Sequence, residues 1–340
     1  RINDLLKIVT QNLMEIRIDP QKFNNIKEAM VRGLKNRKLG QAYSRGGYYN
    51  WLMLLDEQYT EEEKLQALLP LSLDDVKAYA KTLYEKVFIT GLIHGNYNDK
   101  KAIENTNILI DSLKSQPLAE KDRYKQIVEK MPKGKRFSFS REVKDNNNSL
   151  SYAIQVGDKD FALQAQVSML ASIVESDFYT QMRTNQQLGY IVWSSQQRME
   201  DRIFFRLLIQ SSTHGPFEMR KRVNAWLQST DKIFSKLTKE EFERHRQALI
   251  VGLEKEGDSI ASVLSDLYSF AVDEDGDFLY KKKLIDAVKK VKRSDVISQA
   301  RKVFLDPNTP RLEVLMRAKD SKEKVPGGVI DDVERFKEQI

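Results

Sequence analysis

An arginine and a tyrosine close together in this 340-residue sequence are the side chains whose types and spacing point most directly to chemistry. Arg183 ends a segment with helical apolar spacing, and Tyr190 stands early in the strand-like segment that follows. A short turn would bring the guanidinium and the phenol to one rim of a sheet. There both groups could donate hydrogen bonds to a carbonyl oxygen that gains negative charge during a reaction.

A purely structural interpretation of the same pair is also open. Arg183 would then cap the helix C-terminus against its dipole, and Tyr190 would be a half-buried core residue. Spacing alone favours this structural interpretation over the chemical one.

The remaining residues offer no recognisable set of metal ligands and no thiol nucleophile. The histidines, His94, His214 and His245, stand apart in the sequence, and none has a second ligand at zinc-site spacing. Cysteine is absent, which excludes disulfides, thiol catalysis and cysteine zinc sites. The acidic run 273–277 lacks the later Gly and Glu of a calcium loop and is predicted to be solvated. We therefore predict no metal ligands and no complete active site in this sequence.

The charge balance is mildly basic, with a net charge of +7 and a pI of about 9.2. Acidic residues are interleaved with the basic ones, and no nucleic-acid-binding motif is present, so no nucleic-acid partner is predicted. No apolar run approaches the roughly 18 residues that a membrane helix needs, so no membrane association is predicted. The excess positive charge is instead suited to acidic peptide segments.

An internal repeat with an offset of about 220 residues sets the expected domain organisation. Residues 75–84 align with 295–304, and residues 23–34 align with 242–253. The second copy is preceded by strand-like and helical sequence from residue 136, whereas the first copy begins at Arg1. The repeat therefore predicts a first unit that is truncated at its N-terminus, with Arg1 at a cut boundary, and a complete second unit.

The local patterns predict an α+β fold of two related units. Each would be a mainly antiparallel sheet with helices packed on one face, the first lacking its N-terminal part. Helices are predicted through residue 86, at 99–116, at 163–178 and from 217 to 304. Strands are predicted at 87–93, 136–143, 150–156, 188–195, 203–211 and 312–316, with the second and third joined as a hairpin through residues 144–149.

Residues 178–192, which read FYTQMRTNQQLGYIV, strongly resemble the fourth domain of the pitrilysin and insulin-degrading enzyme family of zinc peptidases. Residues 91–96 resemble a strand near the end of that family's third domain. The resemblance implies three parts. Residues 1–116 would be the truncated, mostly helical second part of the third domain, 117–135 a linker, and 136–325 the complete fourth domain.

The resemblance also implies a role for the chain in a larger enzyme. Family members enclose peptides between two bowl-shaped halves, and the first domain binds zinc through an inverted H-x-x-E-H motif and a distal Glu. This chain would be the non-metal C-terminal half, with the zinc bound by the missing N-terminal half and with no cofactor site of its own. Arg183 and Tyr190 would be auxiliary catalytic residues that hold the substrate backbone and stabilise the oxyanion. With the resemblance added, this chemical interpretation is favoured.

The expected function is therefore that of one half of a zinc metalloendopeptidase. Its partners would be peptide substrates and the N-terminal half of the same polypeptide, and the fragment alone would be inactive. The alternative is a non-catalytic structural or interaction subunit of the same superfamily. The resemblance favours a periplasmic over a cytoplasmic location.

Overall fold

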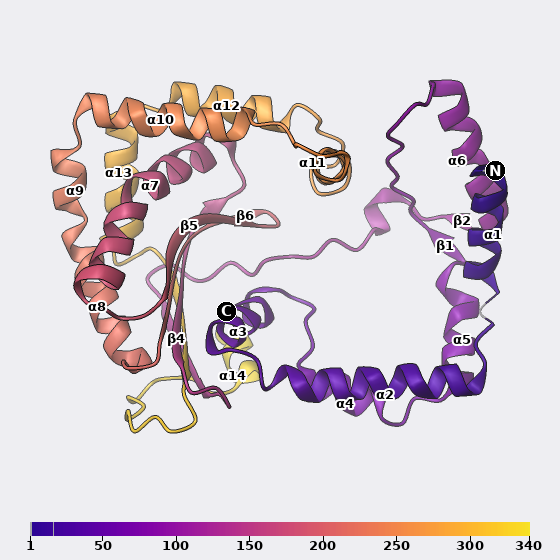
Figure 1. Cartoon of the computed structure of the whole chain (residues 1–340), viewed down its shortest axis with the longest axis horizontal. Helices are drawn as coiled ribbons and strands as arrows, with labels where there is room; N and C mark the ends of the chain where they lie inside the picture. The colour runs from indigo at the N-terminus through magenta and orange to yellow at the C-terminus, as the bar shows by residue number, and fades with distance from the viewer. Residues whose placement is uncertain (1, 16) are drawn as a thin grey trace. The chain divides into compact units, whose positions relative to one another are not determined.

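The computed structural model describes residues 2–15 and 17–340, which form two compact units (Figure 1). The first unit combines residues up to Lys35 with Thr60–Lys125 and Glu256–Phe278, and the second combines Asn36–Tyr59, Gln126–Lys255 and Leu279–Ile340. The chain thus passes between the units several times, and the units cut across the boundaries expected near residues 116 and 136. The division into third and fourth family domains stays a prediction.

The first unit is helical, as the apolar spacing predicts. Thr60 and Ser72 begin two of its helices with capping boxes, in which the Glu63 and Asp75 carboxylates accept a hydrogen bond from the backbone N–H of the cap residue. Its helices are α1 (Ile2–Met14), α2 (Pro20–Arg37), α4 (Glu61–Leu68), α5 (Leu73–Leu83), α6 (Asp99–Leu113) and α11 (Ile260–Val272), with a short 3₁₀ turn η1 (Glu120–Asp122).

The prediction of a strand at residues 87–93 is wrong for most of that range. Only β1 (Lys86–Val87) forms, paired in parallel with β2 (Gln116–Pro117). A β-branched run makes an extended strand only where a neighbour pairs with it, and β2 ends at a proline that can donate no ladder hydrogen bond.

The second unit contains a five-stranded mixed sheet in the order β3-β7-β4-β6-β5. Its strands are β3 (Arg136–Glu142), β4 (Asn148–Asp158), β5 (Ile191–Met199), β6 (Arg202–Ser211) and β7 (Arg311–Arg317). Only the β3–β7 pair is parallel, so the sheet is mainly antiparallel. The predicted β3–β4 hairpin is wrong because β7 lies between the two strands. The connecting loop is instead anchored to helix α3 (Ala42–Leu54), where the backbone N–H of Ala42 donates to the Asp145 carboxylate over 2.8 Å.

Helices cover both faces of this sheet. The Tyr152 hydroxyl donates to Asn224 on α8, whereas the neighbouring Ser151 accepts from Asn50 on α3. Because successive strand residues face opposite sides, α8 and α3 lie on opposite faces (Figure 1). The predicted α+β class is confirmed. The prediction that helices pack on one face of the sheet is incomplete, because α3 packs on the other face. The helices of this unit are α3 (Ala42–Leu54), α7 (Phe161–Tyr179), α8 (Pro216–Ser229), α9 (Asp231–Lys236), α10 (Lys239–Glu254), α12 (Tyr280–Lys290), α13 (Arg293–Phe304) and α14 (Val333–Lys337).

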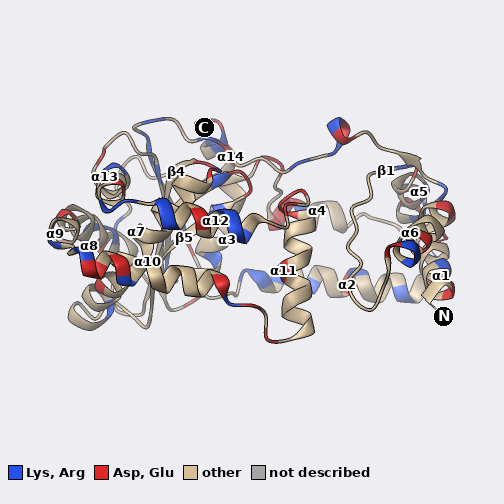
Figure 2. Ribbon diagram, turned by 90° about the horizontal axis from the view of Figure 1, so that it is seen from above, with Lys and Arg blue, Asp and Glu red and all other residues tan. Residues whose placement is uncertain are grey.

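Basic and acidic residues are interleaved along the helices of both units (Figure 2). This pattern agrees with a well-solvated surface of mixed charge rather than with one large patch of positive charge. Among the described residues, none of the helices has the length and apolar character needed to cross a bilayer.

Candidate functional site

The segment between Arg183 and Tyr190 is a tightly built turn that joins helix α7 to strand β5. The α-helix ends at Tyr179 and continues as a widened π-helical turn, η2 (Thr180–Asn185). The Gln186 N–H donates to the Gln181 carbonyl, and the Leu188 N–H donates to the Met182 carbonyl over 2.9 Å. A π turn shifts the side chains that follow it out of α-helical register, and such turns are frequent at functional sites.

Buried apolar residues and a glycine fix the path of this turn. Met182 and Leu188 are both fully buried, so they anchor the turn on either side of its exposed part. Gln187 between them has a φ of +51°, which allows the sharp reversal. A Cβ atom on Gly189 would overlap the backbone carbonyl oxygen of Gln210 on β6. Only glycine therefore lets the chain reach Tyr190 along this path.

The turn brings Arg183 and Tyr190 together, as the spacing predicted. The Arg183 Nη1 donates to the Tyr190 backbone carbonyl over 2.9 Å. The guanidinium carbon lies 4.4 Å from the centre of the Tyr190 ring and 5.2 Å from that of Tyr179. The guanidinium thus lies over two aromatic rings, at distances at which a cation is attracted to a ring face by a cation–π interaction.

The surroundings of the pair separate the two interpretations. Tyr190 is 80% exposed, so it is not the half-buried core residue of the structural interpretation. Its hydroxyl has no hydrogen-bond partner in the described part of the chain, and the same residues supply no carboxylate for Arg183. A guanidinium carries five N–H donors, so most of those on Arg183 stay available to a ligand. Arg183 does not cap the helix as the structural interpretation requires. Its side-chain hydrogen bond in the described residues goes to the backbone carbonyl of Tyr190 and not to the last carbonyls of α7.

The histidines do not form a metal site. The Nδ1 of His245 lies 3.0 Å from the Ser172 hydroxyl, and the Nδ1 of His214 lies 2.9 Å from the Thr213 hydroxyl. His94 is exposed in an irregular segment of the other unit. Within residues 2–15 and 17–340, no cluster of three or more His, Asp or Glu side chains could hold a metal. The residues present therefore do not fit a zinc ion, and no step of the chemistry is assigned to one in this chain.

The acidic run 273–277 is more ordered than a solvated loop. Glu274 is buried, and the Asp275 carboxylate lies 3.4 Å from Arg123 and 3.5 Å from Lys125. It forms a turn with positive φ at Asp275 and Gly276, and the Gly276 N–H donates to the Phe270 carbonyl at the end of α11 over 2.9 Å. At least the Asp275 carboxylate therefore has a structural role, as a partner of Arg123 and Lys125.

Two features of the site were not predicted from the sequence. Tyr179 supplies the second ring against Arg183, and Gly189 is the residue that permits the close approach to β6. The glycine directly before a strand was the available signal, because such a position often marks a close backbone contact.

Comparisons with known proteins match this fold and segment. A family model for the middle or third domain of peptidase family M16 matches residues 1–67. A second model, for domain 4 of the C-terminal lobe of PQQ synthase PqqF-like proteins, matches residues 169–267, which include both Arg183 and Tyr190.

Curated relatives and a solved structure agree with the family models. A nardilysin-like protein of Arabidopsis thaliana is 29% identical over 313 residues, covering 89% of this chain and 30% of the relative. The insulin-degrading enzyme of Drosophila melanogaster is 25% identical over 304 residues, covering 88% of this chain and 31% of the relative. The crystal structure of pitrilysin matches 99% of this chain and 36% of its own with a TM-score of 0.86; at 17% identity it shows the fold alone.

In sequence and fold, the chain is therefore similar to part of an M16-type peptidase. The predicted resemblance is confirmed: the chain matches the C-terminal half of the family that includes pitrilysin and insulin-degrading enzyme. It spans about a third of the length of the curated relatives that it matches.

Proposed function

We propose that this chain is the non-metal C-terminal half of a zinc-dependent endopeptidase that degrades peptides in an enclosed chamber. Arg183 and Tyr190 would bind the substrate backbone and stabilise the oxyanion, while the zinc site would belong to polypeptide outside this chain. The chain alone would not cleave peptides. We further propose a periplasmic location, which cell fractionation with an antibody to the chain would test.

The observation that carries the proposal is the exposed, paired geometry of the two donors. The Arg183 guanidinium lies 4.4 Å from the centre of the Tyr190 ring, and Tyr190 is 80% exposed. A residue needed only for folding would bury its ring or satisfy its hydroxyl. This pair does neither, yet the fold holds it in place through buried residues on both sides.

The chemistry follows from the charge that develops on a peptide carbonyl oxygen under attack. A guanidinium and a phenolic O–H that already face outward can donate hydrogen bonds to that oxygen without reorganising. Stacking against Tyr179 and Tyr190 restricts the Arg183 side chain before substrate arrives, so less rotamer entropy is lost on binding. The pair would therefore contribute more in the transition state than in the ground state.

The test compares variants of the full-length polypeptide that contains this chain. Arg183→Ala should lower kcat/KM for a peptide substrate by about a hundredfold, the loss typical of one oxyanion donor. Tyr190→Phe removes only a hydroxyl from an exposed ring, so it should lower kcat/KM while leaving the melting temperature unchanged. The matched control is Arg301→Ala, which removes another guanidinium, 58% exposed, from helix α13.

Wild-type kinetics in both site variants would reject the assigned roles. A full-length protein that binds peptides but never cleaves them would instead support the alternative of a non-catalytic interaction subunit.

A further inference from the structure

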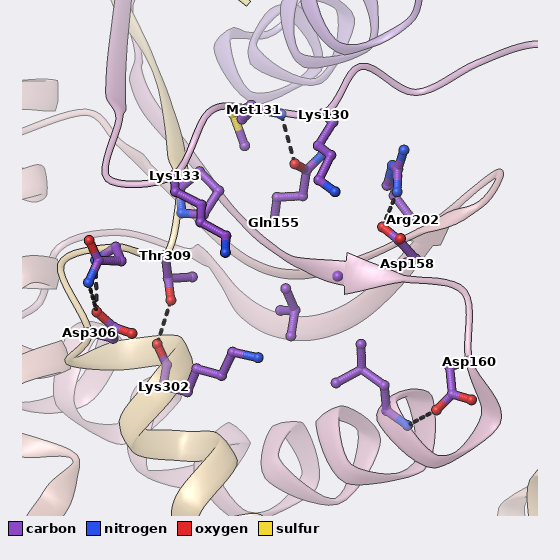
Figure 3. A pocket seen from close by; sticks show the side chains of 15 residues that line it. Lys130, Met131, Lys133, Gln155, Asp158, Asp160, Arg202, Lys302, Asp306 and Thr309 are labelled. Atoms are coloured by element: carbon purple, nitrogen blue, oxygen red, sulfur yellow. Dashed lines mark hydrogen bonds and ion pairs between the residues drawn. The ribbon is translucent and has the colours of Figure 1, made fainter.

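A cavity of about 690 Å³ lies at the end of the second unit's sheet (Figure 3), and neither Arg183 nor Tyr190 lines it. It is lined by the end of β4, the start of α7, the start of β6, the end of α13 and residues 130–133. Along β6, Arg202 at the cavity is separated from Gln210 beside the tyrosine by about eight residues, or about 26 Å of strand. The cavity and the arginine–tyrosine pair are therefore separate sites on the same unit.

The floor of the cavity is formed by an irregularity in β4. The pairing of β4 with β6 shifts register between Gln155 and Gly157. A Cβ on Gly157 would lie 2.8 Å from the end of the Leu163 side chain, so the start of α7 packs closely against this part of β4. Bulges of this kind occur preferentially at sheet ends and next to binding sites.

The acidic groups around the cavity are all engaged within the fold. Asp158 forms an ion pair with Arg202. Asp160 caps α7 by accepting from the Leu163 N–H over 2.8 Å, and Asp306 accepts from the backbone N–H of Asn308 over 2.8 Å.

The lysines are not engaged in this way. Lys130, Lys133 and Lys302 are exposed and have no ion pair or side-chain hydrogen bond in the described part of the chain. Their ammonium groups point into the cavity from two sides (Figure 3). The fold thus leaves three lysine ammonium groups without an ion pair at one place. Of the three aspartates, Asp158 pairs with Arg202, whereas Asp160 and Asp306 keep their charge and accept hydrogen bonds from backbone N–H groups.

The shape and lining of the cavity favour a peptide over a small ion. The lysines stand at an open rim rather than around a closed cage, and buried Met131 and Val156 add apolar surface between them. Lysine ammoniums are flexible point charges, which suit carboxylates in varied arrangements better than one fixed bidentate partner. We propose that this cavity, the lysine cavity, binds the acidic segment of peptide substrates, with two or more Asp or Glu carboxylates on Lys130, Lys133 and Lys302.

This inference rests on the proposed peptidase function and adds a substrate preference to it. A substrate held at Arg183 and Tyr190 would reach the lysine cavity with about eight extended residues. Substrates with an acidic stretch at that distance from the cleaved bond should have a lower KM, with kcat little changed, because the cavity would bind ground state and transition state equally.

The direct experiment measures binding by the whole 340-residue chain, and needs no catalysis. A short fluorescein-labelled peptide with a run of glutamates is titrated by fluorescence anisotropy, beside the same peptide with glutamines. The glutamate peptide should bind about tenfold more tightly, since each exposed ion pair contributes about twofold to threefold. Raising the salt concentration should remove that difference.

Matched variants decide whether the lysine cavity is responsible. The combined variant Lys130→Gln, Lys133→Gln and Lys302→Gln should lose the preference for glutamate. The variant Lys319→Gln, Lys322→Gln and Lys324→Gln removes the same charge from an exposed loop of the same unit and should keep it. Arginine at the three cavity positions should also keep it, which excludes misfolding as the cause of a loss.

Equal affinity for the two peptides, or an equal loss in both glutamine variants, would overturn the proposal. So would strong binding of inorganic pyrophosphate that depends on the cavity lysines but does not displace the glutamate peptide. Each result is independent of cleavage, so a failure here would not be confused with a failure of Arg183 and Tyr190 to act in catalysis.

Discussion

Helices α5 and α13 occupy equivalent places in the sequence repeat but differ in what they pack against. Both form where the repeat predicts a helix, and in the first turn of each an aspartate carboxylate accepts a hydrogen bond from the backbone N–H of the N-cap residue. In α5 no residue is buried, and Leu83 is 42% exposed. In α13 the same face is buried among the second unit's helices and sheet, through Val296, Gln299, Ala300, Val303 and Phe304.

Helices α2 and α10 repeat the contrast. The second-unit helix α10 buries Phe242 and Ile250, whereas α2 buries no residue and leaves Ile26 46% and Met30 53% exposed. Apolar spacing therefore determines that a helix forms, but a packed partner determines whether it contributes to a core. Both proposed sites lie on the unit that has that partner, where buried anchors can hold side chains in fixed positions.

The largest expected effect is a difference in stability between equivalent substitutions on α13 and α5. Phe304→Ala on α13 should lower the free energy of unfolding by about 3–5 kcal/mol, because its ring packs on Phe205 and Trp226 in a fully buried site. The equivalent change Tyr84→Ala, at the end of α5, should cost about 1 kcal/mol or less. Chemical denaturation of both variants gives the comparison, and equal losses would show that the two units are packed alike.

A second pair of variants tests the turn before Tyr190. Gly189→Ala should destabilise the second unit by about 2–3 kcal/mol, because the added methyl meets the backbone of Gln210 and cannot rotate away. Gly47→Ala on α3 has open space around it and should stabilise by about 0.5–1 kcal/mol. Thermal melting of both proteins measures the difference, and a neutral Gly189→Ala would mean that the turn is not constrained as described.

The smallest expected effect is a pH dependence of the second unit. Burial lowers the pKa of His245 below its ordinary value of 6.5, and the charge of Arg244 lowers it further, against the opposing effect of Glu241. The folded state thus favours the neutral ring, which contributes stability above about pH 6.5 that is lost as the pH falls through the folded pKa.

His245→Gln should therefore flatten the fall in melting temperature on the acid side of neutrality. His94→Gln, at an exposed position of the first unit, is the control. The account of His245 would fail if its replacement left the acid-side slope unchanged.

Local patterns in the sequence predicted the helices and the convergence of Arg183 with Tyr190, because a helix followed directly by a strand constrains both. They did not predict that β7 pairs between β3 and β4, since that pairing joins Phe137 to Leu312 across about half of the chain. Nor could they predict that α3 packs on the second unit's sheet, because apolar spacing does not specify which surface a helix covers. The lysine cavity was missed for the same reason, as its lysines come from remote segments that only the folded sheet brings together.

The most direct test of the central claim is a double-mutant cycle on kcat/KM in the full-length polypeptide, with Arg183→Ala, Tyr190→Phe and the combined variant. If the two groups act on one oxyanion as a unit, the combined variant should lose about as much activity as the worse single variant, so that the losses are clearly non-additive. Losses that simply multiply, or no loss in any of the three variants, would contradict the account.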